Sequence, residues 1–112
     1  MHTAPNGMNL TKALRNPMSN ARKIMQYLYT LEYLFGQNSA TKDEILRGAL
    51  NKDISRIRVR GYLSQLFSLM HKNDLIVFRQ YVALDINHRG ISAWSLTNKG
   101  RDLMRSFNYQ IN

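Results

Sequence analysis

The chain has 112 residues, of which 44% are hydrophobic, so it is long and apolar enough to form one domain without disulfides or metals. It contains no cysteine, which excludes disulfides, thiolate metal sites and cysteine nucleophiles and favours a cytoplasmic location. Sixteen Lys and Arg residues oppose seven Asp and Glu residues, and the formal net charge of +9 makes a polyanion the first partner to consider. No apolar run of membrane-spanning length and no signal-peptide core occur, so neither membrane insertion nor secretion is expected.

Residues 1–18 contain both prolines of the chain and only one short stretch of helical character, Leu10–Arg15. This composition predicts a flexible or loosely docked N-terminal arm, followed by a single domain over residues 19–112. Lys12 and Arg15 could contact phosphate, but a frayed terminus is the commoner explanation of such a segment.

A first core helix is predicted after the arm. Ser19 or Asn20 can cap its start, and Gly36 can end it in a left-handed conformation. Its apolar residues recur at helical spacing: Ala21, Ile24, Leu28, Leu31 and Phe35. The helix carries more aromatic residues than one face can bury, so some are candidates for a subunit contact, although aromatics at this spacing more often belong to a core.

The segment Thr41–Glu44 has the sequence of a capping box, in which Thr41 and Glu44 each accept a hydrogen bond from the other's backbone N–H. A second, short helix should follow and end at the turn-like segment 51–53. A third helix is predicted within Arg56–Leu75. A short helix, a turn and a longer helix with a basic front form a helix-turn-helix, a pattern that alone has little specificity.

The third helix has two contrasting faces. Apolar residues form one stripe: Val59, Leu63, Leu66 and Met70. The opposite face is small and polar: Gly61, Ser64, Gln65, Ser68 and Lys72. No carboxylate occurs between Arg56 and Asn73, and arginines lie near the N-terminus of the helix, which suits insertion into a DNA major groove. The alternative is an amphipathic helix whose arginines only keep the chain soluble.

A β-hairpin should follow the third helix. The segment Leu75–Ile86 is rich in β-branched and aromatic residues and predicts one strand, and Ile91–Leu96 predicts its partner. The turn is expected at Asn87–Gly90, with Gly90 supplying a positive φ, so Asn87, His88 and Arg89 would lie at the tip.

Thr97 is predicted to cap a last helix, in which Arg101 and Arg105 should face solvent. The elements together predict a mainly α chain with a small β-hairpin, an α+β fold. Catalysis finds little support, because the carboxylates are scattered and no phosphate-cradling glycine motif or nucleophile elbow occurs. The three histidines lie far apart in the sequence, and His71 should interact with the last carbonyl groups of its own helix rather than bind a metal.

Three helices, a two-stranded hairpin and a C-terminal helix resemble the element order of winged helix-turn-helix domains. The segment VRGYLSQLFSLMHKNDLI, residues 59–76, is similar to the family's recognition helix running into the first strand of its wing. The segment SAWSLTNKGRDLM, residues 92–104, is similar to the exit from the wing in small bacterial regulators. Asn73-Asp74 stand where the family usually has Gly, and Asn accepts the same left-handed conformation. The resemblance spans residues 19–107 and implies a three-helix core, a wing and a C-terminal helix.

The resemblance implies that the third helix contacts bases in the major groove and that the hairpin tip contacts the minor groove or the backbone. Arg can form two hydrogen bonds with a guanine edge, and Gln can do the same with an adenine edge. Polar groups at the start of the second helix could bind a backbone phosphate. The predicted DNA-binding residues are Thr41, Lys42, Arg56, Arg58, Arg60, Ser64, Gln65, Lys72, His88 and Arg89. For each of them taken singly, plain solvation is an equally good explanation.

The sequence therefore predicts a transcriptional regulator that binds specific sites in double-stranded DNA. It should act as a homodimer in the cytoplasm, associated with the nucleoid, without a cofactor, a metal or a small-molecule ligand. One alternative is a winged-helix module that docks a protein partner. Another is a non-specific DNA-binding accessory protein of replication or chromosome organisation.

Overall fold

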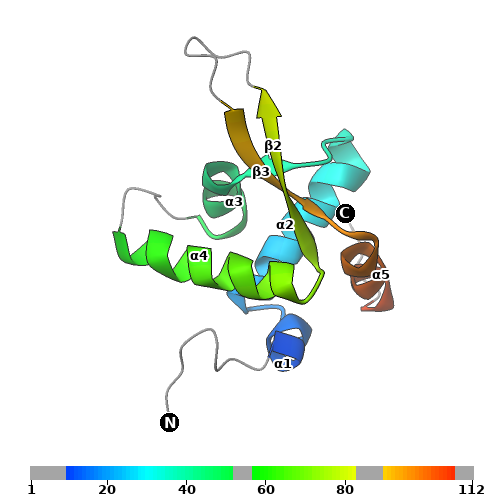
Figure 1. The fold of residues 1–112 in the computed structure, drawn as a ribbon. Helices are drawn as coiled ribbons and strands as arrows, with labels where there is room; N and C mark the ends of the chain where they lie inside the picture. Colours follow the sequence, from blue (N-terminus) through cyan, green and yellow to red (C-terminus); the bar gives the residue numbers. More distant parts are fainter. Residues whose placement is uncertain (1–9, 52–56, 83–89, 108–112) are drawn as a thin grey trace.

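The structure is a computed structural model and describes residues 10–51, 57–82 and 90–107, without the side chains of residues 57–60, 79–82 and 90–92. Within these ranges the chain forms five helices: α1 (Leu10–Arg15), α2 (Asn20–Phe35), α3 (Lys42–Ala49), α4 (Ile57–Lys72) and α5 (Asn98–Ser106). Three strands complete the described part: β1 (Ala40–Thr41), β2 (Ile76–Val82) and β3 (Gly90–Leu96) (Figure 1). The chain is thus mainly helical with a small antiparallel sheet, which confirms the α+β class.

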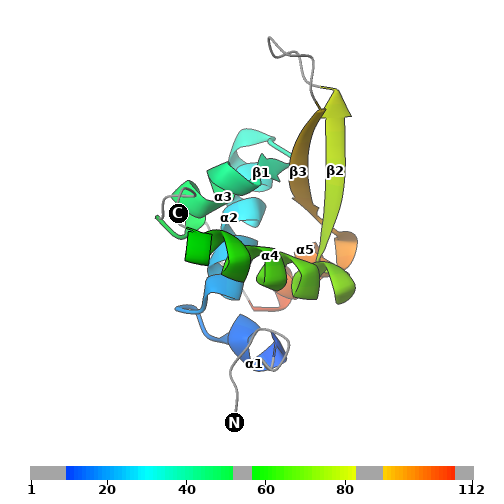
Figure 2. The ribbon, with the colours of Figure 1, turned by 60° about the vertical axis from the view of Figure 1, so that its left-hand side comes forward.

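The hydrophobic core lies between the helices and the inner side of the sheet. Helix α2 packs against α1, α3 and α5, and α4 adjoins β2. The largest side chains that are at most 1% exposed come from all these elements except α1: Ile24, Met25, Ile45, Leu46, Leu63, Leu66, Phe67, Met70, Ile76 and Met104. When the molecule is turned, β2 and β3 are seen side by side along one flank of the helices, with α1 at the far end of the molecule (Figure 2).

Helix α2 begins and ends where its sequence predicts. The Ser19 hydroxyl accepts a hydrogen bond from the Arg22 backbone N–H at 3.1 Å, which satisfies one of the free donors of the first turn. At the other end Gly36 has φ +66°, and the Gly36 and Gln37 N–H groups donate to the Glu32 and Leu31 carbonyls.

Helix α3 starts at the predicted capping box. The Glu44 N–H donates to the Thr41 hydroxyl at 3.1 Å, and the Thr41 N–H donates to the Glu44 carboxylate at 2.9 Å. Helix α4 ends at Lys72, and Asp74 takes a left-handed conformation with φ 62° that turns the chain into β2.

Part of the predicted N-terminal arm belongs to the packed body. Residues 10–15 form α1, whose Leu14 is buried in the core. The Arg22 guanidinium of α2 donates to the Leu14 carbonyl at 2.8 Å and lies 4.3 Å from the centre of the Phe107 ring. One buried side chain of α2 thereby links the first described helix to the end of α5.

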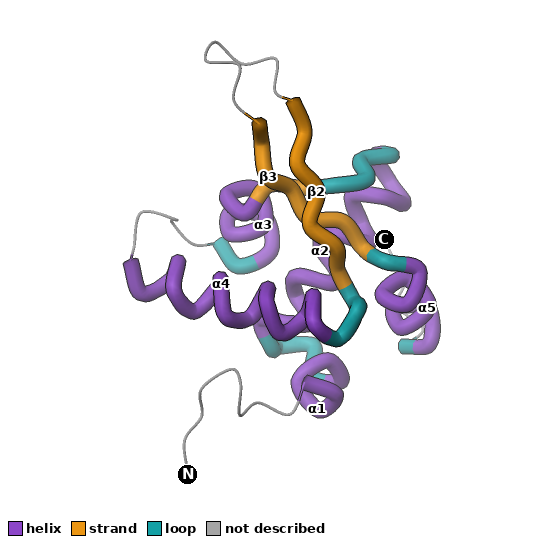
Figure 3. Tube along the Cα trace, viewed as in Figure 1, coloured by secondary structure: helices purple, strands orange, loops and turns teal. Residues whose placement is uncertain are grey.

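The sheet has the strand order β1-β3-β2, and both pairs are antiparallel. The tube in Figure 3 shows β2 rising from the end of α4 and β3 running back down to α5. Strand β1 was not predicted, because residues 37–40 read as a polar link; it pairs with Trp94 and Ala93 of β3. The prediction that Gly90 lies in the turn is wrong: the register that begins with Ile76 opposite Leu96 places Gly90 in β3, opposite Val82. Residues 83–89, with the predicted tip, lie outside the described residues.

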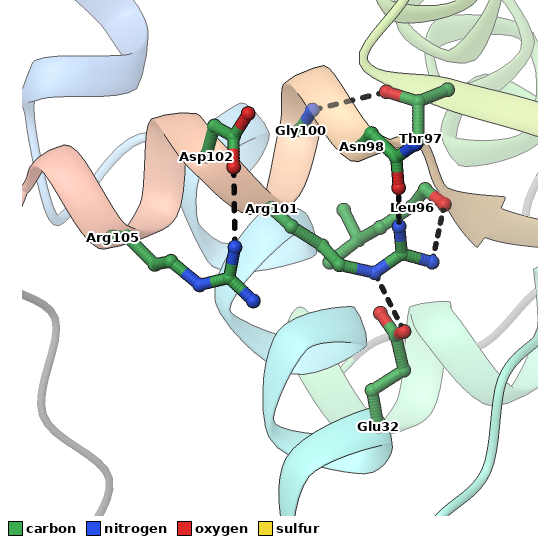
Figure 4. A network of polar contacts seen from close by, with 8 residues as sticks. All are labelled: Glu32, Leu96, Thr97, Asn98, Gly100, Arg101, Asp102 and Arg105. Atoms are coloured by element: carbon green, nitrogen blue, oxygen red, sulfur yellow. Dashed lines mark hydrogen bonds and ion pairs between the residues drawn. The ribbon is translucent and has the colours of Figure 1, made fainter.

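Helix α5 is capped by Thr97, whose hydroxyl accepts from the Gly100 N–H at 3.0 Å, as predicted. The prediction that Arg101 faces solvent is wrong. Its Nε lies 2.7 Å from a carboxylate oxygen of Glu32, and the guanidinium also donates to the Leu96 carbonyl at 3.2 Å (Figure 4). The first turn of α5 packs against α2. Arg101 lies on the polar side of α5, but that side is partly covered by α2. Arg105 does face solvent, where it pairs with Asp102 at 3.1 Å.

Candidate nucleic-acid interface

The outward face of α4 is the candidate interface. On one side of the helix Leu63, Leu66, Phe67 and Met70 are buried, as the 3.6-residue period predicts. On the opposite side five residues are exposed: Gly61, Ser64, Gln65, Ser68 and Lys72. This set, called the α4 face below, has no large apolar side chain and no carboxylate. The predicted division of this helix is therefore confirmed for the side chains that the structure describes.

Gly61 makes the α4 face unusually low near the start of the helix. Apart from the adjacent residues and the backbone of the helix itself, no described atom lies within 4 Å of the position that a Cβ would take there, so no packing contact of the described residues requires glycine. Glycine in a helix interior is also less favourable than alanine by about 0.5–1 kcal/mol. A surface ligand that approaches the helix backbone closely would be a reason for this residue.

Lys42 joins α3 to the side of α4. Its Nζ donates to the Ser64 hydroxyl at 3.1 Å and lies 5.8 Å from the centre of the Phe67 ring. Two predicted site residues that are far apart in the sequence are therefore in direct contact. Thr41 uses its hydroxyl oxygen as the cap acceptor, which leaves its O–H as the group that could contact a phosphate.

The structure describes the other predicted residues to different extents. Arg58 and Arg60 lie in the first turns of α4, but their side chains are outside the described part. Arg58 precedes Gln65 by about two helical turns, so its Cα lies on the same side of the helix as the α4 face. Arg56, His88 and Arg89 lie outside the described residues.

A cluster of rings at the junction of α4 with the sheet was not predicted. The Trp94 ring lies edge to face against three others, with centroid distances of 5.1 Å to Phe67, 5.2 Å to Phe78 and 5.9 Å to His71. His71 Nδ1 lies 3.0 Å from the Ile76 carbonyl oxygen, so the prediction that it meets the carbonyls of its own helix is wrong. The turn at Asp74 brings the start of β2 back beside the last turn of α4. His71 follows Ser64 by about two helical turns, and this spacing could have shown from the sequence that both residues lie on the same side of α4.

The two acidic side chains at the start of α3 have partners within the protein. Asp43 pairs with Arg47 at 3.2 Å, and Glu44 caps α3. Among the described residues no three acidic, histidine or cysteine side chains gather in a way that could hold a metal ion. No helix of the described part is long and apolar enough to cross a membrane. The charge of the α4 face thus comes from Lys72, with Lys42 of α3 beside it.

The chain was compared with models of protein families, with curated proteins and with solved structures. None of them matches. The function is therefore inferred from the α4 face, its neighbours and the charge of the chain.

Proposed function

We propose that the protein binds double-stranded DNA by inserting the α4 face into the major groove, as a winged helix-turn-helix regulator of transcription. The observation that carries this proposal concerns the 16-residue helix α4: from residue 61 to residue 72, where its side chains are described, it is buried on one side and exposed on the other through small, polar and cationic groups. A helix of about 10–12 Å diameter fits a major groove of about 12 Å width when its outer side chains are small. Gln65 can then pair with an adenine edge, while Lys72 and Lys42 neutralise phosphates.

The element order supports the winged helix-turn-helix assignment. Helices α2, α3 and α4 are followed by the β2–β3 pair and by α5, and β2 begins directly after the turn that ends α4. In this proposal the segment between β2 and β3 is the wing and contacts the minor groove or the backbone. The net charge of +9 supports a polyanionic partner.

A homodimer is part of the proposal. The α4 face from Gly61 to Lys72 extends over about 17 Å of helix, which corresponds to about five base pairs. So short a site gives little discrimination in a genome, and two copies on a two-fold site would double its length. Regulation would follow from occupancy of the site, with the protein in the cytoplasm on the nucleoid.

The decisive experiment is selection of bound sites from a pool of random duplexes. We expect recovery of a motif with two-fold symmetry, and we expect Gln65→Ala to relax the preference at one position in each half-site. Equal affinity for the selected duplex and a scrambled one would contradict the proposal and favour a non-specific accessory protein of replication or chromosome organisation.

A second candidate function is a protein-interaction module. It is favoured by three large apolar side chains at the end of α2, where Tyr33, Leu34 and Phe35 are 71%, 50% and 72% exposed. Such a module would bind random duplex weakly, whereas a DNA-binding protein would lose affinity steeply as salt is added. Sedimentation of wild type and of Phe35→Ser would show whether this end of α2 joins two copies of the chain.

A further inference from the structure

His71 is held in one orientation at the junction of α4 with the sheet. Its Nδ1 is 3.0 Å from the Ile76 carbonyl oxygen, and its ring meets the Trp94 ring edge to face at 5.9 Å. A carbonyl oxygen only accepts hydrogen bonds, so Nδ1 must carry the hydrogen. The hydrogen bond therefore fixes the tautomer of the neutral ring and leaves Nε2 as the nitrogen that can meet an outside ligand.

The side chain stands beside the α4 face. His71 is exposed, and it follows Ser64 by about two turns, or about 11 Å along the helix axis. Ser64 accepts a hydrogen bond from Lys42, and Lys42 and Trp94 both contact the Phe67 ring. Lys42 and His71 thus flank one side of α4, the side that faces the sheet.

We propose that His71 is a phosphate-binding residue of the DNA interface, which donates a hydrogen bond from Nε2 to a backbone phosphate when its ring is protonated. The proposal rests on the DNA-binding function proposed above. In the neutral ring Nε2 has a lone pair and would repel the phosphate oxygens. In the cationic ring both nitrogens carry hydrogen, so Nδ1 keeps its bond to Ile76 while Nε2–H binds the phosphate. DNA binding would then take up a proton at this residue.

The charged groups around His71 favour an anion. Among the described side chains near this end of the helix these are Lys72 on α4, Lys99 on α5 and Asp74 in the turn. Strand β3 contributes the uncharged Trp94. Lys99 Nζ donates to the Asn73 carbonyl at 3.1 Å, which brings α5 to the same turn. Two cations and one acid give this region a net positive charge before DNA arrives.

The test measures binding of a labelled random-sequence duplex by fluorescence anisotropy at constant ionic strength between about pH 5.5 and pH 8. We expect wild-type affinity to be roughly three- to tenfold higher at the acidic end. His71→Gln keeps a donor for the Ile76 carbonyl but has no charge, so its affinity should vary much less with pH. His71→Arg is cationic throughout, so it should bind tightly at both ends of the range.

His2→Gln is the matched control, because it removes another histidine, one to which the proposal gives no role, and it should keep the wild-type pH dependence. The proposal is overturned if His71→Gln varies with pH as wild type does, or if His88→Gln alone abolishes the dependence. Calorimetry of wild type in two buffers of different ionisation enthalpy gives proton uptake without any variant, and zero uptake also overturns it. Binding that does not depend on pH would contradict the role of His71 and leave the proposed DNA-binding function intact. Absence of binding at any pH would contradict both proposals.

Discussion

At the scale of single residues, three helical glycines have different roles. A Cβ at Gly100 would lie 2.4 Å from the Leu75 carbonyl oxygen, and one at Gly48 would lie 2.2 Å from the Tyr27 ring. These two allow close packing of α5 and α3 against their neighbours, so larger residues there would displace a helix. At Gly61 a Cβ would meet no other part of the described structure, so a substitution there tests the surface without disturbing the core.

Gly61→Glu places a carboxylate on the α4 face while it replaces a poor helix former with a good one. We expect stability to be unchanged or higher by about 0.5 kcal/mol, and affinity for duplex DNA to fall by about tenfold or more. Urea unfolding and anisotropy measure the two effects. Asn98→Glu changes the net charge equally, at the start of α5, and keeps an acceptor for Arg101; an equal loss of affinity in both variants would show only a general charge effect.

Tyr27 gives the protein a specific sensitivity to alkali. Burial raises the pKa of this phenol above the usual 10.0, and the nearby carboxylate of Glu44 raises it further. The folded state holds the phenol proton more tightly than the unfolded state does. The contribution of Tyr27 to the free energy of unfolding is therefore complete below about pH 10 and is lost as the pH rises through the pKa of the folded state. Urea unfolding from about pH 9 to pH 11 should show a smaller loss for Tyr27→Phe than for wild type. Tyr33→Phe, at an exposed position, should follow wild type, and a parallel course for Tyr27→Phe would refute the assignment.

At the scale of elements, α5 is held to α2 by one ion pair that the sequence did not indicate. The Arg101 side chain is 28% exposed and Glu32 is 18% exposed, whereas Arg105 and Asp102 are 62% and 74% exposed. The inner pair also bonds to Asn98 and to the Leu96 carbonyl (Figure 4). Burial and extra hydrogen bonds make the inner pair matter more for stability than the outer one.

Arg101→Ala should lower the free energy of unfolding by about 1–3 kcal/mol, because it leaves a half-buried carboxylate without its partner. Arg105→Ala, the matched control on the same helix, should cost less than about 0.5 kcal/mol. Thermal and urea unfolding give both values. A double-mutant cycle with Glu32→Ala isolates the pair, and equal losses at positions 101 and 105 would contradict its role.

At the scale of the whole molecule, the excess of cations should appear as salt dependence. Each phosphate contact releases counterions and contributes about −0.9 to the slope of log affinity against log salt concentration. We expect a steep negative slope for wild type, and Lys72→Gln should reduce its magnitude by about one, with a similar loss for all duplex sequences. Anisotropy titrations over a salt series measure the slope. Lys23→Gln, on α2, is the control that should leave it unchanged, and a flat wild-type slope would favour the protein-interaction module.

Features that depend on neighbours within about one helical turn could be predicted from the amino-acid sequence. The caps at Ser19, Thr41 and Thr97, the stop at Gly36 and the two faces of α4 follow from short-range hydrogen bonds and periodicity. These features sufficed to predict an α+β chain and to find the α4 face.

Contacts between residues far apart in the sequence could not be predicted and depend on how the elements pack. The two-residue strand β1 exists because Ala40 reaches Trp94, and the contact of Lys42 with Ser64 depends on how α3 lies against α4. The same holds for the hydrogen bond of His71 to Ile76, which depends on the turn at Asp74. A periodic pattern tells which side of an element is buried, but not which element covers it. The partners are set by the packing of the whole core, to which residues from every part of the chain contribute.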